Sequence, residues 1–307
     1  MIEKAKLTLK GLCMGTADVI PGVSGGTMAF ILGIYEQLLA AIKSFDLKTL
    51  THLIKGDLKG AISRPHFGFI IPLFIGIISA LLFFTRVIPL PKLIISDPEL
   101  IYGLFFGLIL GSIIVLFKHI DNFQFRDLVE TIIGITIGLL IVTMTPKETP
   151  DANWFIFFCG ALAITAMILP GISGSFILLI LGKYAYIIDG LGHFNLGIII
   201  PFALGAATGL IFFSRFLSWL LERFHRATLL VINGILIGSL WMIWPFQNRQ
   251  YIEIREKQRL IESTPIFPEA IDSTTTTSFA LMLGGLVLVM IISYLGDRKK
   301  RPSECRT

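Results

Sequence analysis

Two similar motifs carry the polar groups that could do chemistry: Pro21-Gly22-Val23-Ser24-Gly25-Gly26, followed by Thr27, and Pro170-Gly171-Ile172-Ser173-Gly174-Ser175. Each interrupts a long apolar stretch, where proline removes a backbone donor and glycine loosens the chain. Helices that begin at Ser24 and Ser173 would present bare N–H groups, and such helix starts bind anions. The predicted substrate-binding residues are Ser24, Gly25, Gly26, Thr27, Ser173, Gly174 and Ser175, with Pro21, Gly22, Pro170 and Gly171 as the structural motif. The alternative is an ordinary spanning helix with a Pro-Gly kink.

Two arginines could complete an anion site. Arg86 and Arg215 each follow two phenylalanines and a hydroxyl residue, at the same position of two similar segments. A planar guanidinium can make two parallel bonds to a phosphate. Both arginines are therefore predicted to face a shared cavity and bind the anion, with snorkelling at a helix end as the alternative.

Asp18 is the one acidic residue inside the first motif segment, and Met167 takes its place in the second. A carboxylate within a membrane is costly and usually functional. Asp18 is therefore the predicted coupling site for a proton or cation, and the alternative is a cap at a helix break. The three cysteines and five histidines show no metal-ligand spacing, so no cofactor, metal or catalytic residue is predicted.

The composition places these motifs inside a membrane protein. Of the 307 residues, 54% are hydrophobic and 15% charged, and the mean hydropathy is +0.80, whereas soluble domains carry about 25% charged residues. The net charge of +5 is interpreted as a signal for membrane orientation, not for nucleic-acid binding. No removable signal peptide is predicted, because the basic start lacks a small-residue cleavage site. The predicted apolar segments are 11–42, 68–90, 99–117, 130–145, 154–188, 196–220, 228–246 and 279–295, of which 130–145 is short for a span.

The second half of the chain echoes the first. Ala17–Tyr35 aligns with Ala166–Tyr184, and Ile70–Arg86 with Ile199–Arg215, with proline, glycine and arginine matching in order. The predicted fold is an all-α membrane protein of two inverted repeats, each with a re-entrant helical hairpin and about three transmembrane helices. The repeats are residues 1–150 and 151–307, with hairpins at 11–42 and 154–188.

The hairpin topology places most of the 26 lysines and arginines on one side of the membrane, which predicts that both termini are cytoplasmic. Residues 43–62 are predicted as an amphipathic interfacial helix. Residues 247–278 are charged and are predicted as an external loop of unknown structure.

The duplicated motif, with Gly33-Ile34-Tyr35 and Gly182-Lys183-Tyr184 downstream, resembles the polyprenyl-phosphate transporter family over nearly the whole chain. The resemblance implies a flippase of the cytoplasmic membrane that returns undecaprenyl phosphate from the outer to the inner leaflet. It would recycle the lipid carrier of cell-wall peptidoglycan synthesis. By matching positions, Pro21 to Thr27 and Pro170 to Ser175 would be the family's motif.

Elementary energetics agree with that substrate. A phosphate that crosses hydrocarbon unaided faces a cost of tens of kcal/mol. Inward movement of a dianion also opposes an inside-negative potential, by about 2.3 kcal/mol per charge per 100 mV. Proton or cation coupling is therefore predicted.

Two other functions stay open. Membrane phosphatases of undecaprenyl diphosphate also have inverted repeats and a Pro-Gly-x-Ser motif, but theirs continues with arginine, where Gly25 and Gly174 stand here. Without a cationic group or a nearby base, phosphoester cleavage lacks its electrophile and proton carrier. A transporter for a small soluble anion is the other alternative, because the same N–H groups would bind it.

Overall fold

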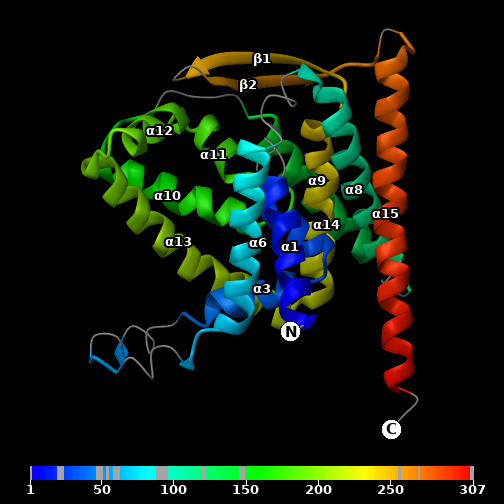
Figure 1. Cartoon of the computed structure of the whole chain (residues 1–307), viewed down its shortest axis with the longest axis horizontal. Coiled ribbons are helices and arrows are strands. Elements are labelled where there is room, and N and C mark those ends of the chain that lie inside the picture. Colours follow the sequence, from blue (N-terminus) through cyan, green and yellow to red (C-terminus); the bar gives the residue numbers. More distant parts are fainter. Residues whose placement is uncertain are drawn as a thin grey trace. The chain divides into compact units, whose positions relative to one another are not determined.

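The computed structural model describes residues 2–18, 24–45, 51–52, 55–57, 63–87, 96–118, 120, 122–144, 149–254, 257–268 and 270–304. These residues form twelve helices and one two-stranded sheet (Figure 1). Among them, five helices are long and apolar enough to cross a membrane, namely α6 (Phe67–Arg86), α8 (Pro98–Lys118), α13 (Leu196–Arg223), α14 (His225–Ile243) and α15 (Ser273–Glu304). The chain is therefore a nearly all-helical, multi-pass membrane protein, as its composition predicts.

The chain divides into two compact units, and each takes helices from both halves of the sequence. The first unit comprises Met1–Pro91, Met144–Leu229 and Glu253–Lys257. The second comprises Lys92–Thr143, Leu230–Ile252 and Gln258–Thr307. Both sequence motifs lie in the first unit, so this unit positions the candidate site.

The first unit is built on two long helix pairs. Helix α1 (Ile2–Asp18) packs along α6, and α10 (Asn153–Ile168) packs along α13 (Figure 1). Glycines allow the backbones to touch: a Cβ atom at Gly76 would overlap the carbonyl oxygen of Thr8, and one at Gly205 would overlap that of Phe157. Small residues at such crossings are typical of membrane helices, which associate by close packing.

Short helices follow each motif. In the first segment these are α2 (Gly25–Ile31) and α3 (Tyr35–Lys43), and in the second α11 (Gly174–Ile180) and α12 (Tyr184–Gly192). Gly33 and Gly182 separate them, with φ values of 65° and 63°, a left-handed conformation that glycine adopts without strain. Helices α11 and α12 bend by 114° at this point. Each motif segment is thus broken twice, at the Pro-Gly motif and again at Gly-x-Tyr, whereas the sequence pattern predicted only the first break.

The second unit contains α8, α9 (Phe125–Val142), α14 from Leu230 and α15, together with most of β1 (Gln247–Ile254) and of β2 (Lys257–Pro265). Helix α8 packs along α15. Helices α9 and α14 approach through glycine, because a Cβ atom at Gly134 would overlap the carbonyl oxygen of Val231. Close helix contacts at glycine thus occur in both units.

The segment 247–278, predicted as an external loop of unknown structure, contains β1 and β2 and the start of α15. Most of the short segment 130–145 lies in α9, which begins earlier, at a capping box of Gln124 and Asp127, and ends at Val142. Helix α9 is not among the five candidate spans. The predicted interfacial helix at 43–62 lies largely outside the described residues.

Candidate functional site

Both motifs interrupt the helical backbone. Helix α10 ends at Ile168 and α11 begins at Gly174, after Ser173 in an extended conformation. Gly171, between them, has a φ of 91°, which favours glycine. In the first segment α1 ends at Asp18 and α2 begins after Ser24, which is also extended. Pro21 and Gly22 lie outside the described residues.

Three hydrogen bonds join the two breaks. The Ser24 hydroxyl donates to the carbonyl oxygen of Met167 at 3.2 Å, and the phenol of Tyr35 donates to that of Ile168 at 2.9 Å. The Thr27 hydroxyl oxygen accepts the backbone N–H of Gly171 at 2.8 Å. The side chains of the first segment thus hold the broken backbone of the second, and the two motifs meet at one place.

The start of α2 is closed by the chain's own groups. The Asp18 carboxylate accepts the N–H of Gly25 at 2.7 Å, and the Ser24 hydroxyl accepts that of Gly26 at 3.1 Å. A Cβ atom on Gly25 would lie 2.7 Å from an Asp18 oxygen, and one on Gly26 2.7 Å from the Met167 carbonyl oxygen. The sequence predicted that these N–H groups are free to bind an anion, whereas the structure shows them hydrogen-bonded to Asp18 and Ser24. Asp18 thus acts as a cap at the start of α2.

The start of α11 is arranged differently. Ser173 makes no side-chain cap here, and its hydroxyl instead pairs with that of Ser175 at 2.8 Å. Ser175 is exposed, whereas Gly174 is buried, and a Cβ atom there would lie 2.5 Å from the Ala163 carbonyl oxygen. Because Met167 stands where the first segment has Asp18, this helix start lacks the corresponding carboxylate. The start of α11 thus carries two hydroxyls that pair with each other and no carboxylate in the place of Asp18.

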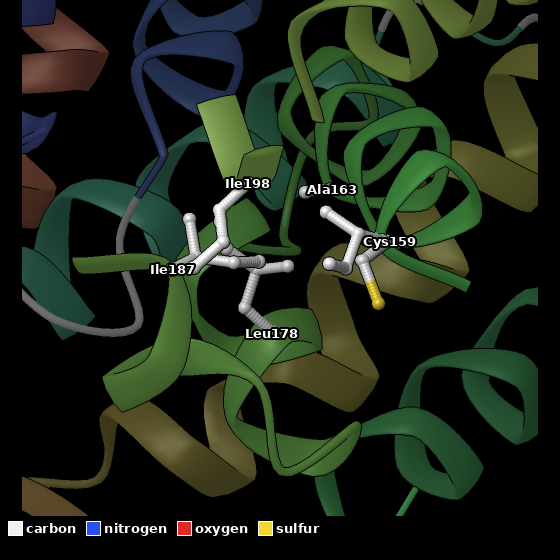
Figure 2. Packing of buried hydrophobic residues seen from close by; sticks show 6 residues of the cluster. Cys159, Ala163, Leu178, Ile187 and Ile198 are labelled. Atoms are coloured by element: carbon white, nitrogen blue, oxygen red, sulfur yellow. The ribbon is translucent and has the colours of Figure 1, made fainter. Parts of the chain in front are cut away.

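An apolar core supports the second segment. It brings together side chains from α10, α11, α12 and α13 (Figure 2), namely Ile156, Cys159, Ala163, Leu178, Ile187 and Ile198. Because such clusters are close-packed, they hold the short helices in place although each is too short to be stable alone.

Lys183 is a residue that the sequence reasoning did not select. Its side chain is only 5% exposed, and its ammonium group pairs with the Asp151 carboxylate, donates to the Thr149 carbonyl oxygen at 2.6 Å and lies 5.6 Å from the ring centre of Tyr186. The first segment has the apolar Ile34 at the same motif position. The sequence signal for this ion pair was a lysine inside the apolar Gly-x-Tyr motif, because a lysine is buried only when it is paired with an opposite charge.

The C-terminal ends of the two seven-residue helices, α2 and α11, are also capped. The Lys10 ammonium donates to the Leu32 carbonyl oxygen at 2.8 Å. The Thr149 hydroxyl donates to that of Leu181, at the corresponding end of α11. A donor at the end of a helix satisfies a carbonyl that the helix leaves unpaired, and a cation also complements the helix dipole.

Of the two predicted anion-binding arginines, the structure describes the side chain of Arg215 but not that of Arg86. Arg86 is the last residue of α6, and its side chain lies outside what the structure describes. Arg215 is partly buried, and its guanidinium donates to the Ile211 carbonyl oxygen of its own helix at 2.9 Å. Its described hydrogen bond therefore does not reach the motifs. Within the described residues, no group of three His, Cys, Asp or Glu side chains could hold a metal ion.

Comparison with known proteins shows the family of this chain. The family described as undecaprenyl phosphate translocase-like matches residues 14–261. A polyprenyl-phosphate transporter of Vibrio cholerae is 41% identical over 244 residues, covering 78% of this chain and 77% of the relative. One of Staphylococcus aureus is 32% identical over 259 residues, covering 77% and 85%. Both relatives are named transporters and not enzymes, as the sequence motif predicted, and no solved structure matches. The chain belongs to the undecaprenyl phosphate translocase-like family of polyprenyl-phosphate transporters.

Proposed function

We propose that this protein moves undecaprenyl phosphate from the outer to the inner leaflet of the cytoplasmic membrane, so that the lipid carrier of cell-wall synthesis is used again. The relatives' names support the polyprenyl phosphate class, and the family description names the undecaprenyl chain. The observation that carries the proposal is the hydrogen bonding between the two motifs, above all the bond from Gly171 to Thr27. It brings two sets of backbone N–H groups and hydroxyls to one place inside an apolar protein.

The proposed head-group site uses donors from both motifs: the hydroxyls and N–H groups at the start of α11, and those at the start of α2. A phosphate that leaves water needs such donors, because an unpaired buried charge is very costly. In the structure Asp18 already holds the N–H of Gly25. A phosphate and the Asp18 carboxylate would therefore compete for this donor, and like charges would repel.

This competition gives Asp18 its proposed coupling role. A proton or cation bound to the carboxylate would free the Gly25 N–H for the phosphate and offset the inside-negative potential that opposes an entering dianion. The Asp18→Asn variant should lose the dependence of transport on external pH. Full transport with an unchanged pH profile in this variant would remove Asp18 from the coupling mechanism.

The helix bounds support the proposal of two repeats, 1–150 and 151–307. Helices α2 and α11 have seven residues each, and α3 and α12 have nine, at matching motif positions. The aligned glycines Gly76 and Gly205 make equivalent helix contacts. In the proposal the repeats have opposite orientations in the membrane, as in many transporters with broken helices, and both termini are cytoplasmic.

The proposal is tested with purified protein in vesicles. Fluorescent undecaprenyl phosphate is added, and the fraction protected from a membrane-impermeant quencher is followed with time. Protein-dependent movement between leaflets is expected, with none in empty vesicles. Uptake of inorganic phosphate without lipid movement would favour a soluble-anion transporter, and phosphate release from undecaprenyl diphosphate would indicate an enzyme.

A further inference from the structure

The outward face of α13 combines an apolar surface with one cation. The helix buries small residues, including Gly205, Gly209 and Ser214, and exposes several large apolar side chains. Arg215 lies within this exposed face, because Ile211 and Trp219 are four residues before and after it. A guanidinium in the apolar face of a candidate membrane span is costly, and an anionic partner would lower this cost.

The Arg215 guanidinium is bonded within its own helix. Its described hydrogen bond joins Nη1 to the Ile211 carbonyl oxygen, which also accepts the Ser214 hydroxyl at 3.3 Å. An arginine carries five N–H donors, so most of its donor capacity is unused by this bond. The Ile211 carbonyl oxygen lies inside α13 and also accepts a backbone N–H of the helix, so the Arg215 side chain can turn to another acceptor without leaving this carbonyl unpaired.

Aromatic rings follow one another along this part of the helix, and Trp219 is four residues after Arg215, on the same side. The ring centres of Phe213 and Phe216 are 6.1 Å apart, those of Phe216 and Trp219 6.2 Å with an interplanar angle of 28°, and those of Trp219 and Phe224 5.9 Å. Phe216 is 52% exposed and Trp219 51%. We call Phe213, Phe216, Trp219 and Phe224 the α13 ladder. Such flat, apolar surfaces can pack against the methyl groups and double bonds of an isoprenoid chain.

We infer that Arg215 and the α13 ladder form a capture site for polyprenyl phosphate on the lipid-facing side of the first unit. The guanidinium binds the phosphate through two parallel bonds, and the isoprenoid chain lies along the rings. The inference rests on the proposed function and adds a binding step that precedes the head-group site at the motifs. Charge complementarity carries it: the ligand is an anionic head on an apolar chain, and the face is one cation beside an apolar ladder.

Transport kinetics distinguish this role from one at the motifs. The Arg215→Ala carrier should need roughly tenfold more polyprenyl phosphate for half-maximal transport, with the maximal rate retained. The Arg126→Ala variant, which removes an exposed arginine of α9, is the control and should behave as the wild type. An unchanged half-saturating concentration, or a loss of maximal rate alone, would overturn the inference. Absence of transport by the wild-type protein would instead contradict the proposed function.

Photo-crosslinking tests binding without transport. Benzoylphenylalanine is introduced at Phe216, and as a control at Phe74, which is 58% exposed on α6. Radiolabelled polyprenyl phosphate should label position 216 several-fold more than position 74, and Arg215→Ala should abolish the difference. Excess unlabelled polyprenyl phosphate should compete, whereas polyprenol and phosphatidylglycerol should not. Equal labelling at both positions, or competition by phosphatidylglycerol, would show ordinary lipid contact and refute the capture site.

Discussion

The hydroxyl oxygen of Thr27 accepts the backbone N–H of Gly171 at 2.8 Å, although 144 residues separate them in the chain. Thr27 is 1% exposed, so this bond is made away from water. It satisfies a donor that the break between α10 and α11 would otherwise leave unpaired. The bond therefore makes the first motif part of the structure of the second.

Removal of this hydroxyl should weaken both the fold and transport. Thr27→Val keeps the shape of the side chain but leaves the Gly171 N–H without an acceptor, which costs about 1–3 kcal/mol. We expect a lower thermal unfolding temperature in detergent and slower transport in vesicles. Thr27→Ser should restore both. Thr136→Val, which removes an exposed hydroxyl bonded only to its own helix, is the control and should change little.

Close packing of α1 and α6 should make Gly76 intolerant of any side chain. In Gly76→Ala the new Cβ atom overlaps the Thr8 carbonyl oxygen, so the helices must separate, at a cost of about 1–3 kcal/mol or more. Gly68→Ala, in the same helix, meets nothing within 4 Å and serves as the control. Thermal unfolding of the two variants should differ clearly. Equal stability would mean that α1 and α6 are not in backbone contact.

The ion pair between the buried Lys183 and the exposed Asp151 predicts that substitutions of its two partners have unequal effects. Asp151→Asn leaves the Lys183 ammonium buried without a counter-charge, and since Asp151 is 65% exposed we expect a loss of about 1–3 kcal/mol, below that of a fully buried pair. Lys183→Met removes the buried charge and leaves a carboxylate in water, so it should cost less. The double variant should match Lys183→Met. A larger loss for Lys183→Met than for Asp151→Asn would contradict this account.

Acid should weaken the start of α15. The Asp272 carboxylate accepts the backbone N–H of Thr275 at 2.7 Å, and this bond lowers the pKa of Asp272 below its ordinary value of 3.8. A lowered folded-state pKa stabilises the protein above the unfolded pKa, and this contribution is lost as the pH falls through the folded pKa.

The measurement is the difference in unfolding temperature between wild type and Asp272→Ala at several pH values. The difference should be constant near neutral pH and should shrink only below pH 3.8. Because the carboxylate is exposed, its size should be small. A difference that grows as the pH falls would contradict the cap.

Several parts of this architecture could be predicted without coordinates. The apolar segments at 68–90, 99–117 and 196–220 correspond to α6, α8 and α13, because length and hydropathy suffice to define a membrane helix. The second break at Gly33 and Gly182 was missed, since a glycine in an apolar stretch does not reveal its φ value. The β strands at 247–265 were missed because charged residues obscure a short strand pattern.

The sequence by itself determined that the chain is a membrane protein, that the Pro-Gly motifs interrupt helices and which family it resembles, because these follow from local composition and motif identity. Only the tertiary structure decided that Thr27 bonds Gly171, that Asp18 occupies the start of α2 and that Arg215 bonds its own helix. Such pairings depend on which groups meet after the helices pack, and a buried N–H group takes whichever acceptor packing places within reach.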